Sequence, residues 1–156
     1  MKGGHYIHLT TQNYIYNCQL YNSMVSKRWK CSRTCVYNIG YHIIWCPKYR
    51  RSVLVGNVEK RLKELLHEKA EEIDITIEKL EIMPDHVHLF VKTPPTVAPH
   101  WMVQQLKGYS SRILRQEFRG LKSRLPTLWT RSYYCESVGH ISEETIKKYI
   151  EDQKRR

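Results

Sequence analysis

The sequence contains no long apolar run, although hydrophobic residues make up 41% of its 156 positions. A membrane-spanning helix needs about 20 consecutive apolar residues, and no segment approaches that length. The first residues, MKGGHY, do not begin the apolar stretch that marks a secretory signal peptide. We therefore expect an intracellular protein with no membrane partner, of a length that suits one domain with its own core.

Cysteine usage is irregular, with five residues and therefore an odd number. Cys31 and Cys35 could contribute to a zinc site, but no second pair follows at the spacing of a zinc finger. We therefore interpret the cysteines as free thiols.

Acidic residues are scarce relative to basic ones. Lys and Arg number 26 against 15 Asp and Glu, which gives a formal net charge of +11. Such an excess is typical of a protein that binds a polyanion, and 11 Tyr and 4 Trp add rings on which unpaired bases can stack. A solvated basic surface, with the rings in the core, is the alternative. Composition alone thus favours a nucleic-acid partner, single-stranded in preference to duplex.

Residues 1–34 are polar and rich in tyrosine, with little periodicity. We predict a basic and aromatic extension here, and Met24 is an alternative start of the protein. Residues 35–156 are predicted to form one folded domain.

The periodicity of residues 35–156 changes several times between that of strands and that of helices. A strand is predicted at 36–45, and a helix with Asn57 as its N-cap follows. A strand over 73–82 changes phase at 78–79, which indicates a bulge, and a tight turn at Pro84 and Asp85 leads into a strand from His86.

The second half of this region repeats the pattern. We predict a helix at 98–118, a fourth strand at 128–135 and a last helix capped by Ser142. The order βαββαβ, followed by a helix, predicts an α+β, ferredoxin-like fold with a four-stranded antiparallel sheet.

His86 and His88 are separated by one residue in a predicted strand. Strand side chains alternate between faces, so both imidazoles lie on one face, roughly 6 to 7 Å apart at the backbone, and can converge on a divalent cation. Two imidazoles suit Mn²⁺ or Zn²⁺ better than Mg²⁺, which prefers oxygen ligands. Gln153 offers an oxygen donor as a third ligand. Considered alone, the pair can equally be strand histidines with no ligand.

Tyr149 and Gln153 are four residues apart, so they share one face of the last helix, beside a stripe formed by Ile146 and Ile150. A tyrosine is a suitable nucleophile toward DNA phosphate, because the phosphotyrosine bond conserves the energy of the phosphodiester for rejoining. A nearby metal would polarise the scissile phosphate. A core or rim aromatic is the alternative role for Tyr149.

Five stretches together resemble the single-tyrosine HUH transposases of the insertion sequence 200/605 type, where U is a hydrophobic residue. They occur in the order of the family and cover about residues 36–153. The stretches are YHIIWCPKYRR at 41–51, MPDHVHL at 83–89, QLKGYSS at 105–111, LWTRSYY at 128–134 and YIEDQ at 149–153.

The resemblance implies a role for each candidate residue. His86 and His88 would be the metal ligands of the HUH motif, Gln153 the third protein ligand of Mg²⁺ or Mn²⁺, and Tyr149 the nucleophile. The family has a ferredoxin-like fold, cuts one DNA strand through a 5′-phosphotyrosine link and recognises subterminal hairpins in single-stranded DNA. Its members are homodimers in which the tyrosine helix of one subunit can complete the site of the other.

The resemblance also sets further expectations. The protein would act in the cytoplasm of a prokaryotic cell, in association with the nucleoid. The residues expected to contact DNA are Lys107, Arg112, Arg115 and Arg131. Residues 1–34 have no counterpart in the family, and only three residues follow Gln153. The alternatives are a domesticated relative that processes chromosomal hairpins and a non-catalytic module that binds single-stranded nucleic acid through sheet aromatics.

Overall fold

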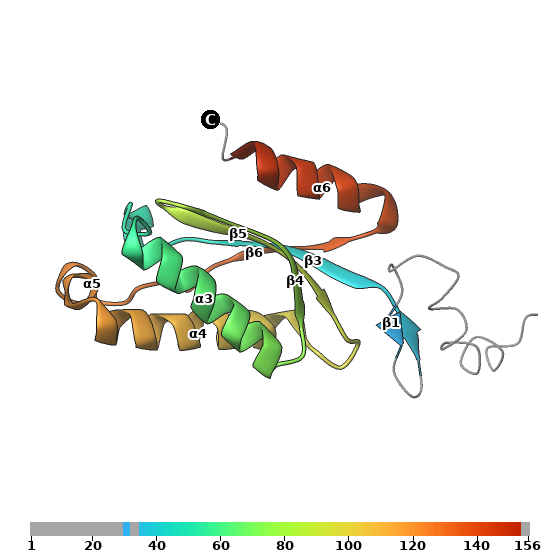
Figure 1. Ribbon diagram of the computed structural model, residues 1–156, viewed down its shortest axis with the longest axis horizontal. Helices are drawn as coiled ribbons and strands as arrows, with labels where there is room; N and C mark the ends of the chain where they lie inside the picture. Colours follow the sequence, from blue (N-terminus) through green and yellow to red (C-terminus); the bar gives the residue numbers. More distant parts are fainter. Residues whose placement is uncertain (1–29, 32–34, 154–156) are drawn as a thin grey trace, which may run out of the picture. The chain divides into compact units, whose positions relative to one another are not determined.

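The computed structural model describes residues 30–31 and 35–153 of the chain (Figure 1). The chain divides into two units, Met1–Asn38 and Ile39–Arg156. The described part of the first unit is a small antiparallel pair of strands, β1 (Lys30–Cys31) and β2 (Val36–Tyr37). The predicted extension at 1–34 and the alternative start at Met24 lie almost entirely outside the described residues.

The second unit is an α+β domain with one antiparallel sheet in the order β4-β5-β3-β6. Counted along this unit, the strand order is 2-3-1-4, so the predicted ferredoxin-like arrangement with an added C-terminal helix is confirmed. No helix of the described chain is both long and apolar enough to cross a membrane. The elements are β3 (Ile39–Trp45), η1 (Lys48–Arg50), α3 (Asn57–Glu72), β4 (Thr76–Met83), β5 (His86–Thr93), α4 (Pro99–Glu117), α5 (Arg119–Arg124), β6 (Tyr134–Val138) and α6 (His140–Gln153).

The two faces of this sheet serve different purposes. Helices α3 and α4 cover one face, and α6 lies on the other (Figure 1). The hydrophobic core fills the space between the sheet and α3 and α4. Its fully buried members include Ile43, Leu62, Leu65, Leu66, Val87, Leu89, Val91, Met102, Leu106 and Leu114. Because strand side chains alternate, the histidines of β5 point to the opposite face, toward α6.

Among the α6 side chains that the structure describes, a buried apolar residue and two ion pairs attach the helix to that face. Ile150 is fully buried, Lys79 Nζ lies 2.8 Å from Glu151 Oε1, and Lys147 Nζ lies 3.4 Å from Glu78 Oε2. Adjacent strand residues ordinarily point to opposite faces. The predicted bulge is confirmed as a register shift between Ile77 and Lys79, and it allows Glu78 and Lys79 both to reach α6.

Other local predictions are confirmed. The turn at Pro84 and Asp85 joins Met83 to its partner His86, and the helix predicted at 98–118 is present as α4 at Pro99–Glu117. Helix α3, however, begins at Asn57 with Gly56 as its N-cap, where φ is +59°, a conformation that favours glycine.

The strand predicted at 128–135 is wrong, because β6 spans Tyr134–Val138. Trp129 makes a single bridge with Pro47, and its ring packs edge-on against Trp45 in the core. The aromatic residues of 128–135 therefore indicated a strand partly because Trp129, one of them, packs in the core. The last helix also begins at His140, before Ser142, and the short helix α5 has no sequence prediction.

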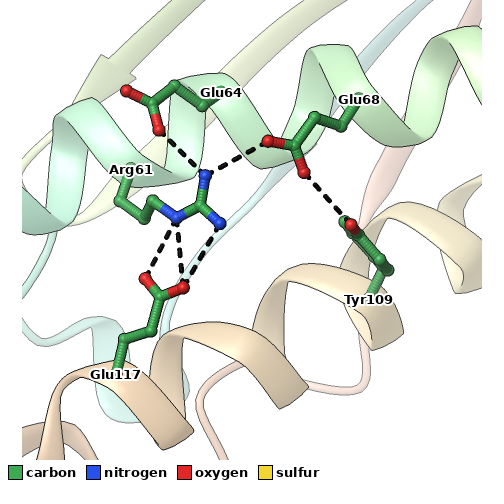
Figure 2. A network of polar contacts seen from close by, with 5 residues as sticks. All are labelled: Arg61, Glu64, Glu68, Tyr109 and Glu117. Carbon is green, nitrogen blue, oxygen red and sulfur yellow. Dashed lines mark hydrogen bonds and ion pairs between the residues drawn. The ribbon is translucent and has the colours of Figure 1, made fainter.

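Figure 2 shows a polar network that links α3 to α4. Arg61 Nε donates to both carboxylate oxygens of Glu117, at 3.2 and 3.0 Å, and its Nη1 donates to Glu64 and Glu68. Tyr109 donates its hydroxyl to Glu68 at 3.1 Å. The hydrogen bond to Glu117, followed by that to Glu64, raises the pKa of Arg61. Exposed ion pairs contribute little stability, so this network chiefly fixes the two helices relative to each other.

Candidate active site

His86 and His88 lie on the sheet face that α6 covers, as their spacing predicts. Their ring centroids are 4.8 Å apart and their planes meet at 73°. His88 is buried, with 3% of its surface exposed, whereas His86 is half-buried beside the turn. The two imidazoles are thus close enough to bind one cation together.

Asp85 orients the first of these rings. Its Oδ1 lies 2.6 Å from His86 Nδ1, and its Oδ2 accepts a hydrogen bond of 2.8 Å from Arg50 Nε. Burial alone would raise the pKa of Asp85, but the hydrogen bonds from His86 and Arg50 outweigh it and the pKa is lowered. The carboxylate therefore accepts a hydrogen bond from Nδ1–H, which leaves Nε2 of His86 available as a ligand atom. The sequence predicted only a turn role for Asp85.

The backbone that carries Arg50 is itself unusual. Tyr49 and Arg50 have φ values of 60° and 51°, in the left-handed region that non-glycine residues rarely adopt. Such conformations collect at functional sites, where the surrounding structure enforces them. Here the turn brings the guanidinium of Arg50 to the carboxylate that orients His86.

His42 is a third histidine at this site, although the sequence gave no reason to group it with the pair. It lies on β3, is 5% exposed, and its Nε2 is 3.5 Å from His88 Nδ1. The ring of Tyr134, on β6, meets His42 edge-on with centroids 6.0 Å apart. Only the pairing of β3 with β5 places His42 here, so no local sequence signal could have found it.

Burial, with smaller contributions from the neighbouring His86 and His42, lowers the pKa of His88 to about 4. Burial also lowers the pKa of His42, with a smaller opposing effect from Glu136. A buried histidine loses more hydration free energy when charged, so both rings are neutral at pH 7. A neutral imidazole is the form that binds a metal.

These pKa shifts predict how stability depends on pH. Between the unfolded pKa of 6.5 and the folded value of about 4, the unfolded chain binds more protons at His88. The stabilisation is therefore complete above pH 6.5 and is lost as the pH falls toward 4, by on the order of 3 kcal/mol. Urea unfolding in the presence of a chelator at several pH values between 4 and 7 measures this loss. The variant His88→Gln should show a shallower slope, and an equal slope in both proteins would contradict the assignment.

Tyr149 and Gln153 both belong to α6, and their side chains lie outside the described residues. The structure places their helix on the same sheet face as His86 and His88. Their predicted roles remain predictions. Among the residues that can be described, no three His, Cys, Asp or Glu side chains form a metal site. The amide oxygen of Gln153 remains the predicted third ligand of a cation at the histidine pair.

Two of the predicted DNA contacts are engaged within the fold. Lys107 Nζ donates to the carbonyls of Thr130 at 2.8 Å and Ser132 at 3.1 Å, and burial lowers its pKa. Arg115 donates to the carbonyls of Leu125 and Pro126. Both residues therefore shape the loop between α5 and β6, and their role toward DNA stays a prediction.

The other two predicted contacts, Arg112 and Arg131, are exposed. Arg112 lies over the ring of Tyr109, and Arg131 lines a cavity of about 360 Å³ together with His100, Lys107 and Tyr133. A surface of this composition suits a polyanion, but DNA contact by either residue remains a prediction.

The attachment of α6 leads to a further prediction. Ile150 is absent from the core on the other face, so Ile150→Asp should release α6 and leave the domain folded. Loss of a buried Ile side chain, together with burial of a charge, amounts to a few kcal/mol. Hydrogen exchange in peptides covering 140–153 should therefore accelerate at least about 10-fold. The control Ile150→Val should change it little, and unchanged exchange in Ile150→Asp would contradict this role.

Comparison with known proteins places the chain in a family. Residues 35–153 match the family profile described as "Transposase IS200 like". The chain is 40% identical over 126 residues to the ISDra2 transposase TnpA of Deinococcus radiodurans, which covers 80% of this chain and 90% of that protein. It is 31% identical over 133 residues to the transposase for insertion sequence element IS200 of Salmonella typhimurium, and the match covers 84% of this chain and 82% of that protein.

Solved structures agree with this placement. A structure from Deinococcus radiodurans described as a transposase has a TM-score of 0.67 at 38% identity, and it covers 80% of this chain and 97% of that one. A REP-associated tyrosine transposase bound to a REP hairpin has a TM-score of 0.57 at 13% identity, and the match covers 78% of this chain and 69% of that one. At this identity the comparison shows a shared fold only.

The ferredoxin-like sheet, its histidine pair and these relatives together define a DNA-processing enzyme, a transposase. The chain belongs to the IS200-like transposase family.

Proposed function

We propose that the protein cleaves and rejoins single-stranded DNA at the ends of an insertion sequence, with Tyr149 as nucleophile and with His86, His88 and Gln153 as ligands of Mg²⁺ or Mn²⁺. The observation that carries this proposal is the convergence of His86 and His88 on the sheet face beneath α6. Helix α6, which carries Tyr149 and Gln153, packs against β4 and β5 on this same face.

In the proposed reaction the phenol oxygen of Tyr149 attacks the phosphorus of the scissile phosphodiester. The bond from phosphorus to the 3′ oxygen breaks, the phenol loses its proton, and the 3′ oxygen takes up a proton and leaves as a hydroxyl, so that the 5′ phosphate stays on the tyrosine. Attack by a 3′ hydroxyl on this linkage reverses the step and rejoins the strand. A cation bound at this site would polarise the phosphate and stabilise the charge that develops on it.

The residues described at the site suit this chemistry. The Asp85 carboxylate holds the His86 ring, and the low pKa of His88 keeps that ring neutral at pH 7. Two nitrogen donors and one amide oxygen suit Mn²⁺ well, and Mg²⁺ can bind when water supplies further oxygen ligands.

The proposed substrate is single-stranded DNA with a subterminal hairpin. The net charge of +11 supports binding to a polyanion, and the exposed Arg112 and Arg131 are candidates for backbone contacts, with Lys107 and Arg115 shaping the adjoining loop. We propose a homodimer in the cytoplasm of a prokaryotic cell, in which α6 of either subunit can complete the site.

Incubation of the protein with labelled hairpin-bearing single-stranded DNA and Mg²⁺ or Mn²⁺ tests this proposal. We expect a covalent protein–DNA adduct that survives denaturation, carries the label of 3′-end-labelled but not of 5′-end-labelled DNA, and does not form when a chelator is present. Tight binding without an adduct under either metal would favour a non-catalytic binding module instead. A domesticated relative would form the adduct with chromosomal hairpins but fail to join two transposon ends.

A further inference from the structure

His88 has a partner at Nδ1 that mirrors the partner of His86. His86 Nδ1 faces the carboxylate of Asp85, its neighbour in sequence, at 2.6 Å. His88 Nδ1 faces Nε2 of His42, which lies 46 positions away in the sequence, at 3.5 Å. In each case the nitrogen nearer the main chain has this partner, and Nε2 is the proposed ligand atom.

The relative orientation of the two rings favours a hydrogen bond over face-to-face stacking. Their planes differ by only 12°, and their centroids are 5.7 Å apart. The separation of the ring centroids is larger than the 3.5 Å between His42 Nε2 and His88 Nδ1, and the difference is about the sum of two imidazole ring radii. Such a difference arises when both nitrogens lie on the line that joins the two centroids. The two imidazoles therefore lie edge to edge in nearly one plane, with a ring nitrogen of each facing the other.

Strand pairing and burial hold His42 in this position. Ile44 is directly opposite His88 in the β3–β5 ladder, which makes His42 the diagonal neighbour of His88 on the same face. Aromatic side chains reach each other across such a diagonal. The edge contact with Tyr134 and the low exposure of His42 restrict its ring further.

A neutral imidazole has one N–H, on either nitrogen, so a hydrogen bond between the facing nitrogens requires that one of them is protonated and the other is not. If His88 carries Nδ1–H, it donates to His42 Nε2, and Nε2 of His88 carries no proton and can bind a cation. If His42 carries Nε2–H, it donates to His88, and Nε2 of His88 is protonated and cannot bind a cation. Only the first arrangement is compatible with a ligand role for His88.

We propose that His42 is a positioning residue that accepts a hydrogen bond from Nδ1–H of His88 and so fixes the tautomer in which His88 Nε2 faces the cation. The role toward the cation rests on the proposed function, whereas the tautomer is a property of the metal-free protein. His42 thus does for His88 what Asp85 does for His86.

The ring nitrogens of the metal-free, full-length protein can be observed directly by long-range ¹H–¹⁵N correlation NMR at neutral pH. We expect His88 to show a protonated Nδ1 and an unprotonated Nε2. In His42→Ala the signal of protonated Nε2 should grow, because the free side chain favours that tautomer. In His42→Gln the original pattern should return, because the glutamine oxygen can replace Nε2 as acceptor.

His67→Ala, on the exposed side of α3, is the matched control and should leave the His88 signals unchanged. Thermal unfolding verifies that each variant is folded. A protonated Nε2 in the wild-type protein would overturn the proposal. The same holds for an unaltered His88 tautomer in a folded His42→Ala.

Titration with Mn²⁺ separates this inference from the proposed function. We expect His86 and His88 to broaden in the wild-type protein, Mn²⁺ affinity to fall 10- to 100-fold in His42→Ala, and most of it to return in His42→Gln. Equal affinity in all three proteins would overturn the positioning role and leave the metal site intact. Absence of broadening in the wild-type protein would contradict the metal role, and the tautomer measurement would still decide the role of His42.

Discussion

Tyr149→Phe is expected to abolish the covalent adduct with hairpin-bearing single-stranded DNA and to lower strand cleavage by roughly 10³-fold or more. The substitution removes one oxygen atom, and that atom is the proposed nucleophile. DNA affinity should stay within about two-fold, because contacts to many phosphates dominate binding. Gel analysis of denatured reaction mixtures measures the adduct, and fluorescence anisotropy measures the affinity.

Tyr109→Phe serves as the matched control, because its hydroxyl donates to Glu68 in the network between α3 and α4. This variant should form the adduct at the wild-type rate. Persistence of the adduct in Tyr149→Phe would show that another residue attacks the DNA, and would remove Tyr149 from the proposed mechanism.

His86→Ala should likewise reduce cleavage by about three orders of magnitude while leaving hairpin affinity nearly unchanged. The variant removes one of two nitrogen ligands, and the partial exposure of His86 makes it a safer substitution than the buried His88. A high concentration of Mn²⁺ should restore part of the activity, because weaker binding is offset by mass action. Cleavage rates measured across a series of Mn²⁺ concentrations give both quantities.

Asp85→Asn is the informative companion to this variant. It retains both histidines but weakens the acceptor at His86 Nδ1, so a 10- to 100-fold loss of metal affinity with full recovery at saturating Mn²⁺ is expected. Cleavage by His86→Ala at the wild-type rate would rule out His86 as a ligand of the metal.

Features with a local physical cause could be predicted from the sequence. Alternation along a strand is enough to place His86 and His88 on one face, and the phase change at 78–79 marks the bulge in β4. The helical stripe of α3 and the turn at Pro84 and Asp85 also depend on neighbouring residues alone. The element order then restricts the fold to the ferredoxin-like arrangement.

Features that depend on strand pairing could not be predicted. His42 joins His88 only through the register of β3 with β5, and Glu78 and Lys79 both reach α6 only because the bulge faces that helix. The strand predicted at 128–135 was misplaced because Trp129 packs against Trp45 in the core and does not belong to β6. Amino-acid composition does not distinguish an aromatic residue that packs in the core from one that lies in a paired strand.

The sequence by itself determined the domain type, the histidine pair and the spacing of Tyr149 and Gln153. The domain type follows from the order of the elements, and the pair and the spacing follow from periodicity within a single strand and a single helix. The tertiary structure decided how those elements are combined. It placed α6 against the histidine face, gave Asp85 and His42 their positions at the two Nδ1 atoms, and directed Lys107 and Arg115 to loop carbonyls. The physical reason is that these contacts join segments far apart in the chain, which only the packed sheet and helices bring together.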